Sequence, residues 1–371
     1  MKKVRPKILF ISRGLGIGGA QKILAFVANR CVDAGYDVTI ISLTDNEPTL
    51  KIRDEIKIDY AGYNPDIVNP LRKIFYKLSF LKKLRKMIRD SKPDLIVTFM
   101  ADVLRIAVLS STGLKIPIIG SERANPLRYT KKQYLKYSKA YRKCNAVVFQ
   151  TQRAASVFDK NIRNKSFVIP NPCIPRLKPI EPYTGIRRKV ITAAGRLENQ
   201  KRFDILISAF SKVVKKHPDY QLHIYGEGDQ RRTLQDRIEQ LSLNKNVVLK
   251  GAVKDVFTEV SNCTAFVLSS DYEGIPNVLI EALSIGIPCI STDCEPGGPR
   301  LLFDGGRRGI LVPTGDIDSM ANAICNYIEN PKLANQFGEL GKEVNKEFAP
   351  DTIAQQWLDT VELVLGSKSN N

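Results

Sequence analysis

Short apolar segments alternate with amphipathic segments along the whole chain, and this alternation restricts the folds that the chain can adopt. The apolar segments have the length of strands, and the segments between them carry apolar residues at helical spacing. Strands that alternate with helices form parallel sheets covered by helices. The predicted strands are residues 7–12, 37–43, 95–98, 116–119, 146–149, 189–194, 220–225, 246–249, 265–268 and 288–291. We therefore predict an α/β fold built on doubly wound parallel sheets.

A proline-rich segment separates the chain into two halves. Prolines stand at positions 170, 172, 175, 179 and 182, and they interrupt regular structure. The length of 371 residues also exceeds what one hydrophobic core usually supports. We predict a first domain over residues 1–170, a hinge over 171–187 and a second domain over 188–349. Residues 350–371 are expected to form a helix that packs back on the first domain, followed by a frayed polar end.

The excess of positive charge lies in the first half. Residues 1–170 contain 33 Lys and Arg against 13 Asp and Glu, whereas residues 171–371 contain 24 against 25. Residues 71–88 and 128–143 are the most basic segments, and the first has apolar residues at helical spacing. Cationic amphipathic helices bind anionic membrane surfaces, although a helix packed inward with its charges in water has the same pattern. We expect a membrane surface as partner, and no nucleic acid, because no nucleic-acid-binding motif is visible.

No segment of the sequence has the pattern of a membrane span or of a metal site. There is no run of eighteen apolar residues, so we expect a cytoplasmic protein peripheral to the membrane. The seven cysteines form no Cys-x-x-Cys pair, and neither His217 nor His223 is near one in sequence. We expect free buried thiols and no metal. Asp316-x-Asp318 has the spacing of a metal motif, but its position before a helix favours capping.

A glycine-rich loop follows the first predicted strand. Gly14, Gly16 and Gly19 match G-x-G-x-x-G between a strand and a helix, which is the fingerprint of dinucleotide binding. A glycine turn at a helix start binds any phosphate, because its backbone amides face the anion. The same turn can also serve only to pack the helix against the strand. An NAD-dependent oxidoreductase is therefore one alternative.

Two segments of the second half are more specific. Gly195-Arg196 and Lys201 follow a predicted strand and precede a helix, where the two cations could neutralise a diphosphate. Glu273 follows another strand, and Glu281 stands in the apolar helix that comes next. A carboxylate there needs a partner, and a ribose diol is one candidate. Taken separately, each of these residues could be a cap or a surface charge.

The spacing of Glu273 and Glu281 resembles the Glu-x7-Glu motif of the family-four retaining glycosyltransferases, which have the GT-B fold. The resemblance extends over nearly the whole chain and is strongest for members that build lipid-linked oligosaccharides, O-antigens or capsules. It implies two Rossmann-like domains that face each other across a cleft. The segments that carry it, in the family's order, are Gly18-Gly19-Ala20, Ser121-Glu122-Arg123, residues 169–172, Gly195-Arg196 with Lys201, Glu273 with Glu281, residues 291–300 and residues 309–313.

The resemblance assigns expected roles to the matching positions. Arg196 and Lys201 would bind the donor diphosphate, Glu273 would contact the sugar near the reacting carbon, and Glu281 would hold the ribose. The remaining donor contacts would come from Gly18, Gly19, Gly195, Val253, Gly274, Ile275, Asn277 and Val278, with Val253 near the uracil. A nucleotide sugar would be a substrate, and no cofactor is expected.

The chain departs from the family pattern at Arg123. Many relatives have a histidine in the loop that aligns with Ser121-Glu122-Arg123, and a sugar contact made by that histidine must be absent or replaced here. Glu122 and Arg123 are therefore predicted only as candidate contacts to the sugar or the acceptor.

The resemblance implies a metal-independent retaining transferase. It would move a hexose or N-acetylhexosamine from a UDP-sugar to a polyprenyl-diphosphate-linked saccharide at the cytoplasmic membrane face. A GDP-mannose-dependent mannosyltransferase of the same fold stays open. A nucleotide-sugar epimerase would need its own acid and base residues, and an NAD-dependent oxidoreductase has no use for Arg196, Lys201 and Glu281.

Overall fold

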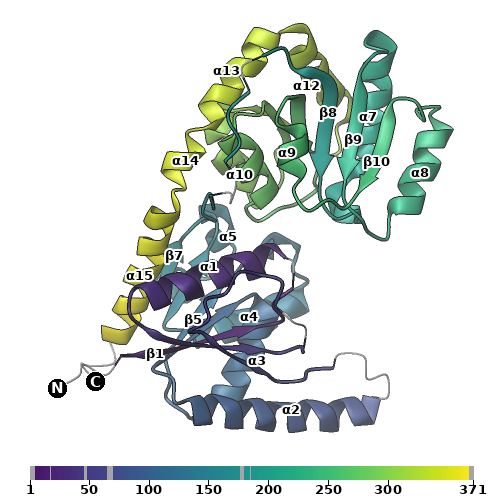
Figure 1. Cartoon of the computed structure of the whole chain (residues 1–371). Helices are drawn as coiled ribbons and strands as arrows, with labels where there is room; N and C mark the ends of the chain where they lie inside the picture. Colours follow the sequence, from purple (N-terminus) through teal and green to yellow (C-terminus); the bar gives the residue numbers. More distant parts are fainter. Residues whose placement is uncertain are drawn as a thin grey trace. The chain divides into compact units, whose positions relative to one another are not determined.

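The computed structural model describes residues 5–16, 18–45, 48–64, 70–175, 179–183 and 185–366 (Figure 1). The chain divides into two compact units. The first consists of Met1–Asn171 with Asp351–Asn371, and the second of Pro172–Pro350. The division therefore falls at the start of the proline-rich segment, and the C-terminal helix belongs to the first unit.

The described part of the first unit is built on a seven-stranded sheet in which every pairing is parallel. The strand order is β3-β2-β1-β4-β5-β6-β7. Strands β2 and β3 are therefore added on one side of β1, and β4 to β7 are added on its other side. Such a reversal of strand order is the feature at which doubly wound sheets bind ligands. The strands are β1 (Lys7–Ser12), β2 (Asp37–Ser42), β3 (Lys57–Tyr60), β4 (Leu95–Phe99), β5 (Ile118–Ser121), β6 (Ala146–Phe149) and β7 (Ser166–Val168).

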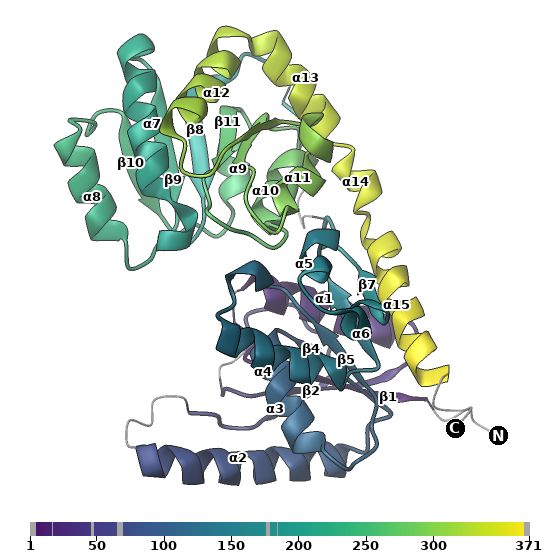
Figure 2. The ribbon, with the colours of Figure 1, turned by 180° about the vertical axis from the view of Figure 1, so that it is seen from behind.

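Helices cover both faces of this sheet because side chains along each strand alternate between the faces. Ile8 and Phe10 of β1 belong to one buried cluster, and Leu9 and Ile11 belong to another. The first cluster also contains residues of α1 (Gly19–Asp33) and α15 (Pro350–Gly366), and the second contains residues of α2 (Pro70–Ser91), α3 (Ala101–Ser111) and α4 (Lys131–Arg142). Figure 2 shows α15 at the far side of the sheet from α2 and α3. The short elements are η1 (Pro126–Arg128), α5 (Gln152–Ser156) and α6 (Lys160–Arg163).

The described part of the second unit is a six-stranded parallel sheet in the order β10-β9-β8-β11-β12-β13. Its strands are β8 (Arg188–Ala194), β9 (Gln221–Tyr225), β10 (Val247–Gly251), β11 (Cys263–Leu268), β12 (Cys289–Thr292) and β13 (Ile310–Val312). Its helices are α7 (Phe203–Lys216), α8 (Arg231–Gln240), α9 (Val256–Val260), α10 (Asn277–Ser284), α11 (Gly298–Leu302), α12 (Ile317–Glu329), α13 (Pro331–Gly341) and α14 (Val344–Glu347), with η2 (Asn199–Lys201) and η3 (Asp304–Gly306). The two doubly wound parallel sheets confirm the predicted fold class.

The structure confirms each predicted strand and adds β3, β7 and β13. All three added strands lie at sheet edges, where strands are short and their apolar pattern is weak. Most boundaries differ from the predicted ones by one or two residues. The strand predicted at residues 116–119 begins at Ile118, because Pro117 has no backbone N–H to donate to a ladder. Pro276 is the N-cap of α10.

Two other sequence predictions are confirmed by local geometry. The Asp316 carboxylate caps α12 by accepting a hydrogen bond from the backbone N–H of Ser319 at 2.9 Å. All seven cysteines are free and buried, as expected for small apolar side chains. Within the described residues, no helix combines the length and apolarity needed to cross a bilayer.

Candidate active site

The loop between β8 and α7 contains Gly195, Arg196 and Lys201. The N–H of Gly195 donates to the carbonyl oxygen of Tyr225 at 2.9 Å, which ties the loop to the end of β9. Gly226 must be glycine, because its φ is 141° and a Cβ there would lie 1.9 Å from the carbonyl oxygen of Gly195. The stem of Lys201 crosses Gly195, where an added Cβ would lie 3.1 Å from Cε. The glycines therefore shape the loop that carries Lys201.

Lys201 and Glu273 form a largely buried ion pair. The Nζ of Lys201 lies 2.6 Å from Oε1 of Glu273, and the two side chains are 15% and 10% exposed. The hydroxyl of Ser270 donates to the same carboxylate oxygen at 2.8 Å. Two opposite charges taken out of water stabilise each other only when the geometry is good and further hydrogen bonds support the pair, and Ser270 supplies one such bond here.

The loop of Glu273 is fastened to the loop of Lys201 by further contacts. The side-chain amide of Gln200 donates to the carbonyl oxygen of Tyr272 at 2.8 Å, and the N–H of Asp271 donates to the carbonyl oxygen of Gln200 at 2.9 Å. Arg202, in the left-handed region at φ 47°, pairs with Asp271 at 3.1 Å. These contacts make the two loops one connected structure at the carboxyl ends of β8 and β11.

The segment after Glu273 is held from its other side. The N–H of Glu273 donates to the carbonyl oxygen of Glu295 at 3.1 Å. Gly298 approaches Gly274 so closely that a Cβ on Gly298 would lie 1.7 Å from the carbonyl oxygen of Gly274. Burial and the nearby Glu273 carboxylate raise the pKa of the Cys294 thiol to about 12, so Cys294 stays protonated beside the ion pair.

The other donor residues predicted in the second unit lie around these loops. Gly274 and Ile275 lie between Glu273 and α10, and Asn277, Val278 and Glu281 belong to that helix. The Arg196 side chain is 73% exposed and pairs with Glu198 at 2.5 Å. Val253 is 37% exposed, in the loop after β10. Gly18 and Gly19 belong to the first unit, where Gly18 is the N-cap of α1.

Sequence reasoning missed Ser270, Gln200 and Cys294. Ser270 lies three residues before Glu273 in sequence, and this short separation could have indicated a hydrogen bond between the two side chains. Nothing in the sequence shows that Gln200 reaches Tyr272 or that Cys294 lies near Glu273, because these contacts join loops that follow different strands of the sheet.

Glu122, at the end of β5, is enclosed by hydrogen-bond donors of the first unit. Its carboxylate accepts from the backbone N–H groups of Arg123 and Ala124, both at 2.9 Å. The hydroxyls of Tyr129 and Tyr141 also donate to it. Burial, together with Glu122, raises the pKa of both phenols, so both remain donors.

Arg123 is buried in the same unit between two aromatic rings. Its guanidinium carbon lies 5.1 Å from the ring centre of Phe99 and 5.3 Å from that of Trp357 in α15. Its Nη1 donates to the side-chain oxygen of Asn171 at 3.2 Å. Burial lowers the pKa of Arg123 to about 9. The geometry of Glu122 and Arg123 favours a structural role for both, and their contact with a sugar or acceptor stays a prediction.

One cluster of potential metal ligands occurs among the described residues. Atoms of His217, Cys325 and Glu329 lie within 4.8 Å of one another, and Nε2 of His217 is 3.0 Å from Oε1 of Glu329. His217 is far from Cys325 in sequence but follows α7, which packs against α12. The cluster stands at the opposite end of α7 from Lys201. The expectation that the protein holds no metal stays a prediction.

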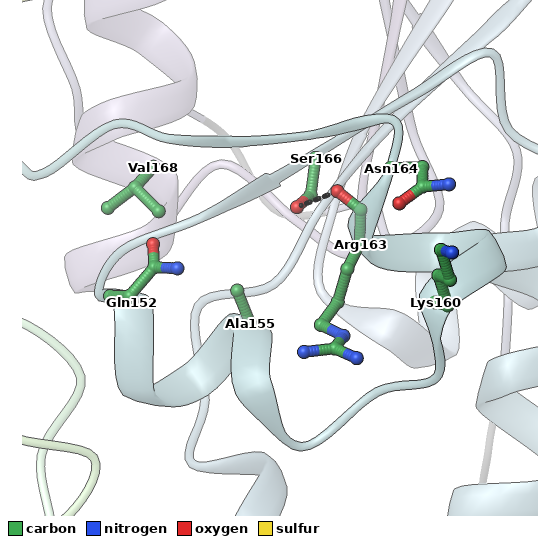
Figure 3. Close-up of a pocket in the computed structure, with 7 residues that line it drawn as sticks. All are labelled: Gln152, Ala155, Lys160, Arg163, Asn164, Ser166 and Val168. Carbon is green, nitrogen blue, oxygen red and sulfur yellow. Dashed lines mark hydrogen bonds between the residues drawn. The ribbon is translucent and has the colours of Figure 1, made fainter.

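A pocket of about 360 Å³ lies in the first unit, over α5, α6 and β7 (Figure 3). Its lining includes Gln152, Lys160 and Arg163, and the hydroxyl of Ser166 donates to the carbonyl oxygen of Arg163 at 2.8 Å. None of the residues predicted for the donor or the acceptor lines this pocket.

Comparisons with known proteins agree with the two-sheet fold. The family model described as "Glycosyltransferase Family 4" matches residues 17–175, and "Glycosyl transferases group 1" matches residues 184–344. An uncharacterized glycosyltransferase of Methanocaldococcus jannaschii is 32% identical over 348 residues, which cover 80% of this chain and 86% of that protein.

Two further similarities extend over nearly the whole chain. A Campylobacter jejuni enzyme named GalNAc-alpha-(1->4)-GalNAc-alpha-(1->3)-diNAcBac-PP-undecaprenol alpha-1,4-N-acetyl-D-galactosaminyltransferase is 24% identical over 359 residues, covering 96% of this chain and 98% of its own. The crystal structure of Anabaena HepE in complex with UDP matches with a TM-score of 0.78 at 19% identity, over 96% of this chain and 99% of that one. The fold, the two family matches and the Methanocaldococcus relative lead to one conclusion: the chain belongs to the family-four glycosyltransferases of the GT-B fold.

Proposed function

We propose that this glycosyltransferase moves a hexose or an N-acetylhexosamine from a UDP-sugar to a lipid-linked saccharide, with retention of configuration and without a metal. The observation that carries the proposal is the buried pair of Lys201 and Glu273, with Ser270 on the same carboxylate oxygen. It places one cation and one hydroxyl-binding carboxylate side by side. A donor with a diphosphate next to a sugar offers partners for both.

The chemistry of the donor explains why these charges matter. Transfer breaks the bond between the anomeric carbon and the diphosphate oxygen, which leaves an oxocarbenium-like sugar and an additional negative charge on UDP. Lys201 and Arg196 would stabilise that charge, and each such group contributes on the order of 3 kcal/mol to the transition state. Glu273 would hold sugar hydroxyls. In front-face attack the acceptor oxygen bonds to the same face of the carbon, and its proton passes to the departing phosphate oxygen.

The choice of UDP rests on the solved structure of HepE, which is described as a complex with UDP. Glu281 in α10 would accept hydrogen bonds from the ribose hydroxyls, and the exposed Val253 would lie against the base. GDP-mannose is the second candidate donor. The family assignment leaves the NAD-dependent alternative without support.

The choice of acceptor rests on the Campylobacter jejuni relative, whose name specifies an undecaprenyl-diphosphate-linked saccharide. An acceptor of this kind has its lipid in a membrane and its sugar at the surface. The basic first half of this chain carries the charge that an anionic membrane attracts. We place the enzyme at the cytoplasmic face, in the synthesis of a surface polysaccharide such as a lipopolysaccharide or a capsule.

Thermal unfolding with UDP, GDP, ADP and NAD⁺, each with a chelator, tests the proposal. A ligand at about one hundred times its Kd stabilises the folded state by roughly 2.7 kcal/mol. We expect UDP to raise the Tm of the wild type and of Lys212→Ala, whose ammonium lies in an exposed pair with Asp318. We expect a smaller rise for Lys201→Ala, measured against its own ligand-free Tm. Stabilisation by NAD⁺ alone would refute the proposal, and stabilisation by GDP alone would favour the mannosyltransferase.

A further inference from the structure

Helices α7 and α12 of the second unit pack against one another over one face of the sheet (Figures 1 and 2). Val213 of α7 and Cys325 of α12 belong to the same buried cluster. The C-terminal ends of the two helices meet, because His217, the C-cap of α7, contacts Glu329, the last residue of α12. Two residues that are 112 positions apart in sequence therefore form one corner of the unit.

Three different metal-binding groups converge at this corner. Nε2 of His217 lies 3.0 Å from Oε1 of Glu329, and one ligand atom from each of these residues and from Cys325 lie within 4.8 Å of one another. Cys325 and Glu329 are four residues apart on α12, a spacing that puts two side chains on the same side of a helix. An imidazole nitrogen, a thiol sulfur and a carboxylate oxygen are thus brought together from two helices.

The ends of the two helices favour a cation at this place. The last carbonyl groups of a helix carry a partial negative charge, equivalent to roughly half an elementary charge. His217 and Glu329 stand at two such ends. The last turn of α7 contains Lys215 and Lys216, but the last turn of α12 has no basic residue and finishes with the Glu329 carboxylate. A carboxylate at a helix C-terminus is unfavourable unless a cation lies beside it.

The thiol of Cys325 adds a ligand that is otherwise unused. The residue is buried, and within the described part of the chain its sulfur makes no hydrogen bond. Burial raises the pKa of this thiol, so it is neutral in the metal-free protein. A dication would displace the thiol proton to solvent. The thiolate and the Glu329 carboxylate would then balance both charges of the ion, so that the nearby Lys216 meets no excess of positive charge.

The separations are close to those around a tetrahedral zinc ion. Ligand atoms bound to zinc at roughly 2.0–2.3 Å lie about 3.3–3.8 Å apart. The three groups here, within 4.8 Å of one another, would need shifts of about 1 Å to reach this geometry. The side chains of His217 and Glu329 are 20% and 51% exposed, which gives them room to adjust and gives an ion access from solvent. A water molecule would take the fourth position.

We propose that His217, Cys325 and Glu329 form a zinc site that joins the end of α7 to the end of α12. The mixed donor set selects the metal, because magnesium and calcium prefer oxygen ligands alone, whereas zinc accepts nitrogen, sulfur and oxygen. The ion would have a structural role, since the cluster stands at the opposite end of α7 from Lys201. The site goes beyond the proposed function, in which transfer itself needs no metal. The sequence-based expectation that the protein holds no metal would be wrong for this site.

A simpler interpretation uses the same three residues without a metal. His217 would serve only as the hydrogen-bond partner of Glu329, and Cys325 would be one of seven buried free thiols. This explains each residue separately but gives no reason for a thiol beside the pair. The two interpretations differ in one measurable property, because only a metal site makes zinc affinity depend on all three side chains.

Cobalt and zinc titrations of the untagged full-length chain test the site. Metal is first removed with a chelator, and the chelator is then removed by dialysis. We expect Co²⁺ to produce the near-ultraviolet charge-transfer band of a cobalt–thiolate bond together with the visible bands of a tetrahedral ion. Zn²⁺ should abolish both sets of bands. We also expect Zn²⁺, but not Mg²⁺, to raise the Tm of the metal-free protein.

Variants identify the ligands. Three variants each remove one proposed ligand: His217→Gln, Cys325→Ala and Glu329→Gln. We expect each to weaken zinc binding by more than about a hundredfold, which is the most that the loss of an outer-shell partner costs. Three matched controls remove the same chemical groups elsewhere in the chain and should bind zinc like the wild type: His223→Gln, Cys31→Ala and Glu227→Gln.

The outcomes separate this site from the proposed function and from misfolding. His217 and Glu329 are partly exposed, so their glutamine variants should stay folded and keep the stabilisation by UDP. A charge-transfer band that persists in Cys325→Ala would overturn the inference. Zinc stabilisation as large in His217→Gln and Glu329→Gln as in the wild type would also overturn it, as would a wild type that shows neither cobalt bands nor stabilisation by zinc.

Discussion

Lys201 and Glu273 are 72 residues apart in sequence, yet the ammonium of one lies 2.6 Å from the carboxylate of the other. Each comes from a loop at the carboxyl end of a neighbouring strand, β8 or β11. In the ligand-free protein each charge neutralises the other. A donor diphosphate would compete with Glu273 for Lys201, while the sugar hydroxyls would engage Glu273. The pair therefore holds the site in a charged form before the donor arrives.

Breaking this pair should destabilise the folded protein. Lys201→Met leaves the Glu273 carboxylate buried without its cation, which we expect to cost about 3 kcal/mol. Adding Glu273→Gln removes the unpaired charge and should restore part of the loss. Urea unfolding of both variants measures the free energies. Lys212→Met, which breaks an exposed pair, should cost less than about 1 kcal/mol. Equal losses from the two lysines would contradict this.

Glu273→Gln should impair transfer more than donor binding. The amide keeps the size of the side chain but loses the charge that would accept hydrogen bonds from the sugar under the proposed function, and we expect kcat to fall about a hundredfold. UDP should still raise the Tm. Glu227→Gln, in an exposed pair with Arg231, serves as the control and should keep the wild-type kcat. An assay of UDP release with a lipid-linked acceptor measures the rates, and an unchanged kcat for Glu273→Gln would exclude the role given to it.

Asn171→Ala should reduce stability if Arg123 has a structural role. It removes the side-chain acceptor of the Arg123 guanidinium and leaves a buried charge less well paired, at a cost of about 2 kcal/mol. Arg123→Met places an apolar side chain between Phe99 and Trp357 and leaves no buried charge, so it should reduce stability less than Asn171→Ala does. Thermal unfolding and activity are measured together. Loss of activity in Arg123→Met at an unchanged Tm would instead support a contact with the sugar or the acceptor.

Stability should fall in mild acid because of His223. Burial, with Lys250 and Arg188 nearby, lowers the pKa of His223 to about 4. In the unfolded chain the imidazole has a pKa of about 6.5, so the unfolded state binds more protons between these values. The contribution to stability is complete above pH about 6.5 and is lost as the pH falls towards about 4, by on the order of 2 kcal/mol.

Urea unfolding over this pH range measures the loss. In His223→Gln, which keeps a polar side chain that cannot titrate, the free energy of unfolding should depend less on pH. A pH dependence as steep as that of the wild type would assign the loss to other groups.

Most strands of this fold could be predicted from the local apolar pattern of the sequence. Every predicted strand was found, since a buried parallel strand is a continuous apolar run that few other structures produce. The edge strands β3, β7 and β13 were missed because they are short and half exposed, so that their pattern resembles a loop. Strand β5 begins only after Pro117, and the apolar pattern of residues 116–119 did not indicate this.

The candidate site was predicted only in part. Glu273 and Lys201 could be named from their positions after strands. Their ion pair, however, depends on the strand order, which places β8 beside β11 as well as beside β9, the next strand in sequence. Gln200 follows β8 and Ser270 follows β11, so the pairing of these two strands also brings Ser270 and Gln200 to the site. The closeness of His217 to Cys325 was missed for a similar reason, since α7 and α12 meet only through packing on the sheet.

The sequence by itself determined the class of the fold, the glycine-lined loops and the basic character of the first half. These follow from short-range physics: apolar periodicity, backbone freedom at glycine and the sum of charges. Only the tertiary structure decided that Arg123 lies buried between Phe99 and Trp357, and that Ile74, Phe75 and Leu78 lie exposed on α2. The burial of a side chain depends on which segments pack against it. Strand order and helix packing bring distant segments together, and a local sequence pattern does not determine them.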